Sequence, residues 1–227
     1  QARQSEVLAD WDVSPTSLVF SRDGHTLYAV VPEDEQRKVY AIPVRGKTLE
    51  QPSEMVSTGS ASSPIPLPNG NVLYVLSTLQ SPNDVYMHIL GNNVRLTNFL
   101  HWSEPHRNID LGPTPERFTY KGADNVTMHG WLIKPPSFDD DVWSGRSFPL
   151  AVLIHGGPEG DWSNGWSTRW NPLAFAAAGF VVATLDPSGS IGFGQRLTDR
   201  ILEHWGDRAK DDLLMGCLLY TSPSPRD

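Results

Sequence analysis

The chain has 227 residues, of which 39% are hydrophobic and 10% aromatic, and its formal net charge is −8. This composition provides enough apolar side chains for a buried core and excludes a disordered chain. The acidic balance and the lack of a Lys/Arg cluster argue against nucleic acid or an anionic membrane surface as a partner. The longest apolar run, 175–185, is too short to span a bilayer.

The first hundred residues contain a repeat with a spacing of 46 residues. Three pairs of dipeptides carry it: Asp23-Gly24 and Asn69-Gly70, Leu27-Tyr28 and Leu73-Tyr74, Val39-Tyr40 and Val85-Tyr86. Asp-Gly and Asn-Gly favour tight hairpin turns, and four short strands near this period are typical of a β-propeller blade. We therefore expect residues 1–100 to form two consecutive blades, with Tyr28 and Tyr74 at equivalent positions. Two blades cannot close a propeller, so either the chain is a fragment, which we favour, or the repeat is a small sandwich.

Residues 101–116 are rich in proline and polar side chains and are expected to be a linker. Strands are then expected at 117–122 and 125–136 around a turn, at 148–154 as a strand buried on both faces, and at 180–187. One helix should begin at Asn171-Pro172 and end at Gly179. A second should place Leu197, Ile201, Leu202 and Trp205 on one face and end at Gly206. Strands alternating with helices over 117–216 predict a mostly parallel α/β sheet.

The segment His155-Gly156-Gly157-Pro158 directly follows the expected strand at 148–154. The carboxyl end of such a strand is where α/β sheets place their ligand sites. Acyl transfer needs backbone N–H groups aimed at the oxygen that becomes negative, and glycines allow the backbone to come close. Half of an oxyanion hole is therefore one interpretation of this segment, and a plain tight turn is the other.

Four runs carry a resemblance to a known family: WLIKP, FPLAVLIHGGPEGDWSNGWSTRWNP, AAAGFVVATLDPSGSIGFGQ and HWGDRAKDDLL. They resemble the prolyl oligopeptidase family of serine peptidases, and most closely its secreted fungal dipeptidyl peptidase V branch. That family joins an N-terminal β-propeller to a C-terminal α/β-hydrolase domain. The resemblance implies that the N–H of Gly157, with that of Gly156, belongs to the oxyanion hole. It also implies that His155 and Pro158 shape the loop and that His155 is not the base of a catalytic triad.

The nucleophile is expected to lie outside the chain. Gly-x-Ser-x-Gly, the turn that exposes a nucleophilic serine, is absent from the sequence. The resemblance implies that this turn follows the helix beginning near Asp211-Asp212 by roughly two dozen residues, with the acid and the base later still. Residues 217–227, CLLYTSPSPRD, contain two prolines and no apolar face, so we expect them to break that helix. The same string resembles the translation of a sequencing adaptor, and we therefore expect an artefactual tail there.

These observations predict a fragment of a secreted serine peptidase that releases N-terminal dipeptides from peptide substrates. An acylaminoacyl-peptidase-like or esterase-type hydrolase is one alternative, and a propeller interaction module on an inactive hydrolase domain is another. Asn125 heads the sequon Asn-Val-Thr and is expected to be glycosylated. The fragment contains no signal peptide, and the sequence does not predict the oligomeric state.

Neither a cofactor nor a metal is expected. The histidines are scattered, and the three aspartates at 139–141 are typical of a solvated loop rather than of a calcium site. The single cysteine, Cys217, excludes an intrachain disulfide. Trp162, Trp166 and Trp170 either line the approach to the active site or pack between domains, and we favour packing.

Overall fold

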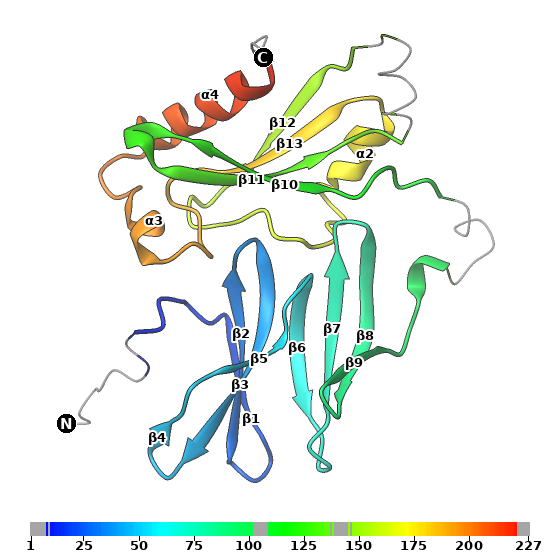
Figure 1. Ribbon diagram of the computed structural model, residues 1–227, viewed down its shortest axis with the longest axis vertical. Coiled ribbons are helices and arrows are strands. Elements are labelled where there is room, and N and C mark those ends of the chain that lie inside the picture. The colour runs from blue at the N-terminus through cyan, green and yellow to red at the C-terminus, as the bar shows by residue number, and fades with distance from the viewer. Residues whose placement is uncertain are drawn as a thin grey trace. The chain divides into compact units, whose positions relative to one another are not determined.

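A computed structural model describes residues 8, 10–101, 109–136, 138, 145 and 147–221. The chain divides into two compact units (Figure 1). The first unit comprises Gln1–Trp102 together with Ser163–Gly165, and the second comprises Ser103–Trp162 and Trp166–Asp227. Each unit is built on its own hydrogen-bonded sheet.

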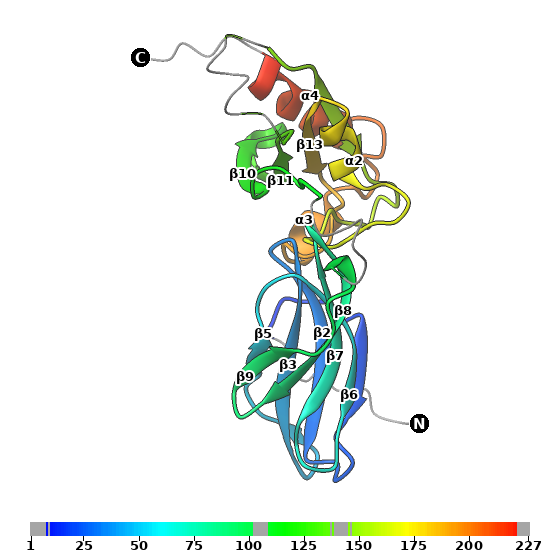
Figure 2. The same ribbon diagram turned by 90° about the vertical axis from the view of Figure 1, so that its right-hand side faces the viewer.

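The first unit consists of strands in two antiparallel groups, which lie side by side in Figure 1 and overlap in the turned view of Figure 2. One group has the order β1-β2-β3-β5, with β4 also paired to β3, and the other has the order β6-β7-β8-β9; a single parallel bridge between Arg37 and Ser60 joins them. A 3-10 helix, η1 (Phe99–His101), follows. The strands are β1 (Ser17–Phe20), β2 (Thr26–Glu33), β3 (Gln36–Arg45), β4 (Thr48–Leu49), β5 (Ser53–Val56), β6 (Ser60–Pro66), β7 (Val72–Thr78), β8 (Ser81–Ile89) and β9 (Asn92–Arg95).

The two hairpin turns that begin the repeat differ in length by one residue. Gly24 and Gly70 occupy the same place in their turns, since each N–H donates to the carbonyl three residues earlier. The first turn, however, is closed by Ser21 N–H donating to Thr26 O, and the second by Leu67 N–H donating to Asn71 O. The strands after the turns are therefore offset by 45 residues and not by 46.

This difference moves Tyr28 and Tyr74 to opposite faces of their sheets, because successive strand residues alternate between faces. Tyr74 packs against Val30 and Val39, so it points from the second group of strands toward the first. Tyr28 lies on the same face of β2 as Val30, so it points from the first group toward the second. Ala29, the residue 45 positions before Tyr74, points to the other face and packs against Ile42. The prediction that Tyr28 and Tyr74 are equivalent is wrong.

The second unit contains a four-stranded mixed sheet with the order β10-β11-β13-β12. Its strands are β10 (Glu116–Lys121), β11 (Thr127–Ile133), β12 (Leu150–Ile154) and β13 (Val181–Asp186). A short 3-10 helix, η3 (Ala123–Asn125), connects β10 to β11, and these two strands pair antiparallel as predicted. Strands β12 and β13 are parallel.

Strand β12 forms one edge of this sheet within the described residues. Its side chains are only partly buried, and that of Ile154 is 58% exposed. The prediction of a strand buried on both faces is therefore wrong for β12. It holds for β13, a central strand whose residues after Val181 are all buried; Ala183 and Leu185 pack in one cluster with Met128 and Leu197.

Three helices accompany this sheet in the described part of the chain. Helix α2 (Pro172–Ala177) begins as predicted, since Asn171 Oδ1 accepts a hydrogen bond from Leu173 N at 3.0 Å. Helix α3 (Gln195–Asp199) is shorter than predicted. Leu197 and Ile201 are buried, but Leu202 and Trp205 are exposed, because both lie beyond the end of the helix at Asp199 and the backbone turns away at Glu203, where φ is +61°.

Helix α4 (Arg208–Thr221) runs beside β10 and η3 (Figure 1). It continues through Cys217 to Thr221, so the predicted break at Cys217 is wrong: the first proline of the tail comes only after Thr221. The proposed linker at 101–116 lies partly outside the described residues, and the domain limits stay predictions. None of the described helices combines the length and the apolar character that crossing a membrane requires.

Candidate functional site

The loop after β12 contains two exposed glycines, Gly156 and Gly157. Within the described part of the chain neither N–H forms a hydrogen bond. Gly157 has φ +144°, and a Cβ atom there would lie 2.7 Å from the backbone N of Glu159. Only glycine therefore fits this position without a shift of the loop, whereas a Cβ on Gly156 would meet open space.

His155 anchors the start of this loop to β13 and to the turn after it. Its Nε2 lies 3.0 Å from Ser190 Oγ and 3.3 Å from Asp186 Oδ1, and its Nδ1 lies 3.2 Å from Gly156 O. The side chain of Asp186 is fully buried. Burial of the imidazole opposes protonation, but the hydrogen bond and the negative charge of Asp186 outweigh it, so the pKa of His155 is raised above its ordinary value.

Ser190, His155 and Asp186 together superficially resemble a Ser-His-Asp triad, but their geometry is not catalytic. In a triad the carboxylate binds one imidazole nitrogen and the serine binds the other. Here both side chains contact Nε2. Ser190 is also fully buried, and its hydroxyl donates to Pro187 O at 2.6 Å. Ser190 is thus a structural residue of the turn after β13.

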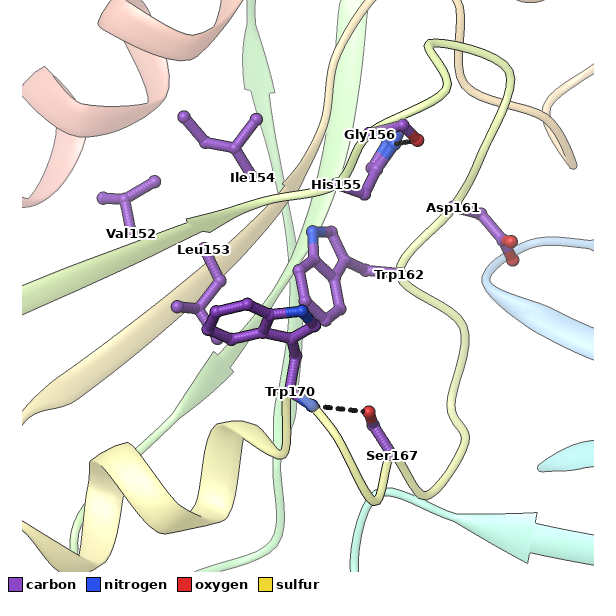
Figure 3. A pocket seen from close by; sticks show the side chains of 9 residues that line it. All are labelled: Val152, Leu153, Ile154, His155, Gly156, Asp161, Trp162, Ser167 and Trp170. Atoms are coloured by element: carbon purple, nitrogen blue, oxygen red, sulfur yellow. Dashed lines mark hydrogen bonds between the residues drawn. The ribbon is translucent and has the colours of Figure 1, made fainter.

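A cavity of about 440 Å³ lies beside the end of β12 and the start of the loop (Figure 3). In Figure 3 the indole rings of Trp162 and Trp170 lie close together beneath His155, whereas Asp161 points away from them. Trp170 is 55% exposed. Two of the three tryptophans considered in the sequence therefore line a cavity of the second unit. The lining residues are Val152, Leu153, Ile154, His155, Gly156, Asp161, Trp162, Ser167 and Trp170.

A second buried carboxylate, that of Asp212 on α4, was not singled out from the sequence as a bonding group. Its two oxygens accept hydrogen bonds from Ala123 N at 2.7 Å and Ser188 N at 2.8 Å. Arg200 bonds to Ser188 Oγ and to Ala123 O, and so joins the same two loops. These partners lie 24 or more residues from Asp212 in sequence, so no local pattern could have indicated them.

The remaining predicted site residues lie elsewhere. Asn125 is exposed in η3, at the turn between β10 and β11. Pro158 follows Gly157 in the loop, and the peptide bond between them is cis. The part of the chain that the structure describes contains no cluster of three or more His, Cys, Asp or Glu side chains able to hold a metal, and the aspartates at 139–141 lie outside that part.

Comparison with known proteins identifies the family. Residues 166–222 match the sequence profile of the prolyl oligopeptidase family. The chain is 36% identical over 209 residues to dipeptidyl-peptidase 5 of Aspergillus fumigatus and 34% identical over 220 residues to that of Schizosaccharomyces pombe. The chain belongs to the prolyl oligopeptidase family. The predicted family is therefore confirmed. The aligned regions cover 92% and 94% of this chain but only 28% and 30% of those two proteins.

The fold of this prolyl oligopeptidase family chain is similar to that of peptidases of known structure. Pyrococcus horikoshii acylaminoacyl peptidase matches with a TM-score of 0.76 at 20% identity, over 94% of this chain and 31% of that one. Porphyromonas gingivalis dipeptidyl peptidase 4 matches with a TM-score of 0.70 at 19% identity, over 93% and 30%. The described strands and helices therefore have the arrangement of about a third of these peptidases.

Proposed function

We propose that the full-length protein containing this chain is a secreted serine peptidase that releases dipeptides from the N-termini of peptides. The family and the curated relatives named dipeptidyl-peptidase 5 support serine peptidase chemistry in that protein. An acylaminoacyl-peptidase-like activity is the second candidate, because a solved structure of similar fold is an acylaminoacyl peptidase. An esterase, or an interaction module on an inactive hydrolase domain, remains the third.

We further propose that the two groups of strands in the first unit are blades of a β-propeller, and that residues 117–216 begin an α/β-hydrolase domain. Antiparallel groups of four strands that repeat after 45 to 46 residues support the blades. The sheet order β10-β11-β13-β12, in which the parallel pair is out of sequence, supports the hydrolase domain. In this arrangement a further strand of the full-length protein would pair with the free edge of β12.

One observation carries the proposed chemistry: the N–H groups of Gly156 and Gly157, which have no hydrogen-bond partner among the described residues, lie just beyond the carboxyl end of β12. When a serine attacks a peptide carbonyl, the carbonyl oxygen becomes negative, and N–H donors fixed in advance stabilise that charge. An acyl-enzyme then forms and is hydrolysed by water. The described loop supplies the donors, while the serine, its base and the orienting acid would come from other parts of the full-length protein.

The 227-residue chain alone is expected to be inactive, because it contains no Gly-x-Ser-x-Gly turn. The test uses purified full-length protein and two chromogenic substrates, a dipeptide amide with a free amino group and an N-acetylated amino acid amide. Turnover of the first and not of the second, abolished by a serine-directed phosphonate, supports the proposal. Preference for the acetylated substrate would favour the second candidate, and no turnover of either would favour the third.

Gly157→Ala tests the role of the loop in the same assay. Because Gly157 has φ +144° and no room for a Cβ, the substitution must displace the loop, and we expect kcat to fall about 100-fold. Gly206→Ala is the matched control, since a Cβ at Gly206 meets nothing and its φ is not positive. An unchanged kcat in Gly157→Ala would contradict the oxyanion role.

A further inference from the structure

We propose that Asp186 is a positioning residue that fixes both ends of the loop His155–Trp162 and thereby sets the place of the Gly156 and Gly157 N–H groups. The inference rests on the proposed function only for its effect on catalysis. The hold on the loop itself follows from contacts within the second unit.

The geometry places one carboxylate oxygen between the two ends of the loop. Asp186 Oδ1 accepts from Trp162 N at 2.8 Å and lies 3.3 Å from His155 Nε2. Asp186 ends β13, whose residues pair with β11 on one side and β12 on the other. The loop is therefore tied at its first and last residues to the most enclosed strand of this sheet. A third tie, from Ile191 N to Gly160 O at 3.0 Å, holds the middle of the loop.

The partners of His155 assign its protons. Pro187 O can only accept, so Ser190 donates its hydroxyl proton there and is left as an acceptor toward Nε2. Gly156 O can also only accept, so Nδ1 must donate to it. Both ring nitrogens are thus donors, which is the protonated imidazolium. Asp186 supplies the compensating negative charge at the buried end of the ring.

This arrangement makes the hold on the loop dependent on pH. The charged groups that face His155 are Asp186 on β13 and Asp161 on the loop itself, and Tyr120 on β10 faces Asp186. Because the pKa of His155 is raised in the folded protein, its ion pair is complete at acidic pH. The pair is lost as the pH rises through that raised value. The pH profile of kcat should therefore fall on its alkaline side when His155 loses its proton.

Three variants of the full-length protein distinguish the hydrogen bond from Trp162 N to Asp186 from the ion pair between His155 and Asp186. Asp186→Asn keeps an oxygen that can accept from Trp162 N but removes the charge opposite His155. Asp186→Ala removes both bonds. Asp207→Asn is the matched control, because Asp207 forms an exposed pair with His204 at 3.0 Å and lies outside the loop. Thermal unfolding confirms that each variant is folded before it is compared.

The first measurement is hydrogen exchange by mass spectrometry in peptides covering 153–165 and 187–194. In Asp186→Ala we expect exchange about tenfold faster at Trp162 N–H, which loses its charged acceptor, and faster exchange at Ile191 N–H, which does not touch Asp186. Asp207→Asn should exchange like the wild type in both peptides. Wild-type exchange at Ile191 in folded Asp186→Ala would overturn the proposal.

The second measurement is the pH dependence of kcat and KM for the dipeptide substrate. In Asp186→Asn we expect the alkaline fall in kcat to move down by about one pH unit, with KM little changed, because oxyanion donors act on the transition state. An unshifted profile with a uniform loss of activity would mean a merely structural role and would overturn the effect on catalysis. If the wild type turns over no substrate, the proposed function is wrong. The hydrogen-exchange measurement then tests by itself whether Asp186 fixes the loop His155–Trp162.

Discussion

At the scale of single residues, Asn125 combines a glycosylation sequon with an exposed place in the turn between β10 and β11. We expect Asn125 to carry a glycan when the full-length protein passes through a secretory pathway. Deglycosidase treatment of secreted protein should convert Asn125 to Asp, which mass spectrometry of tryptic peptides detects. Asn125→Gln should remove one glycan from the intact mass.

The third residue of the sequon provides the control. Thr127 Oγ1 accepts from Lys121 Nζ at 2.9 Å, and Thr127→Ser keeps both this hydroxyl and the sequon. The glycan should therefore remain in Thr127→Ser. An unmodified Asn125 in secreted wild-type protein would count against both the glycan and the proposed secretion.

At the scale of strands and their packing, two buried tyrosines of the first unit differ in how their hydroxyls are bonded. The Tyr40 hydroxyl on β3 donates to Glu33 Oε2 at 2.5 Å. The Tyr74 hydroxyl on β7 is buried and has no partner among the described residues, and burial raises the pKa of Tyr74 to about 12. Removing the two hydroxyls should therefore have opposite effects on stability.

We expect Tyr74→Phe to raise the free energy of unfolding by about 1 kcal/mol, because it removes an unsatisfied polar atom and keeps the ring stacked on Tyr86. Tyr40→Phe should lower it by about 1 kcal/mol, because Glu33 Oε2 then loses one of its two bonds and keeps only the ion pair with Lys38 Nζ at 2.7 Å. Thermal unfolding of the full-length variants measures both shifts. A loss of stability in Tyr74→Phe as large as that in Tyr40→Phe would show that a partner for the Tyr74 hydroxyl has been missed.

At the scale of the whole molecule, the described part of the second sheet has a free edge at β12, and Ile154 there is 58% exposed. An unpaired edge with an apolar side chain favours association between copies. We expect the 227-residue chain to elute largely as oligomers in size-exclusion chromatography, and Ile154→Lys to shift it toward monomer.

The same substitution should act in the opposite sense in the full-length protein. If a further strand pairs with β12 there, as we propose, its side chains flank Ile154 on the same face, and Ile154→Lys should lower the melting temperature because the apolar cross-strand contacts of Ile154 are lost. Equal stability of the wild-type and variant full-length proteins would mean that the edge of β12 stays free.

The sequence by itself determined the features that depend on neighbouring residues. The turns at Gly24 and Gly70, the β10–β11 hairpin and the start of α2 at Asn171 follow from local backbone preferences, which act over a few residues. The family also followed from continuous runs of sequence, and the comparisons confirm it. The loop at Gly156 and Gly157 was located in the same way, although its role stays a proposal.

Only the tertiary structure decided the features that depend on distant partners. One extra residue in a turn places Tyr28 and Tyr74 on opposite faces, and a count of identical dipeptides cannot detect this because the hydrogen bonds that close the turn set the register. The carboxylates of Asp186 and Asp212 acquire their partners across 24 to 89 residues of sequence, since buried polar groups must find bonds wherever the fold brings a donor.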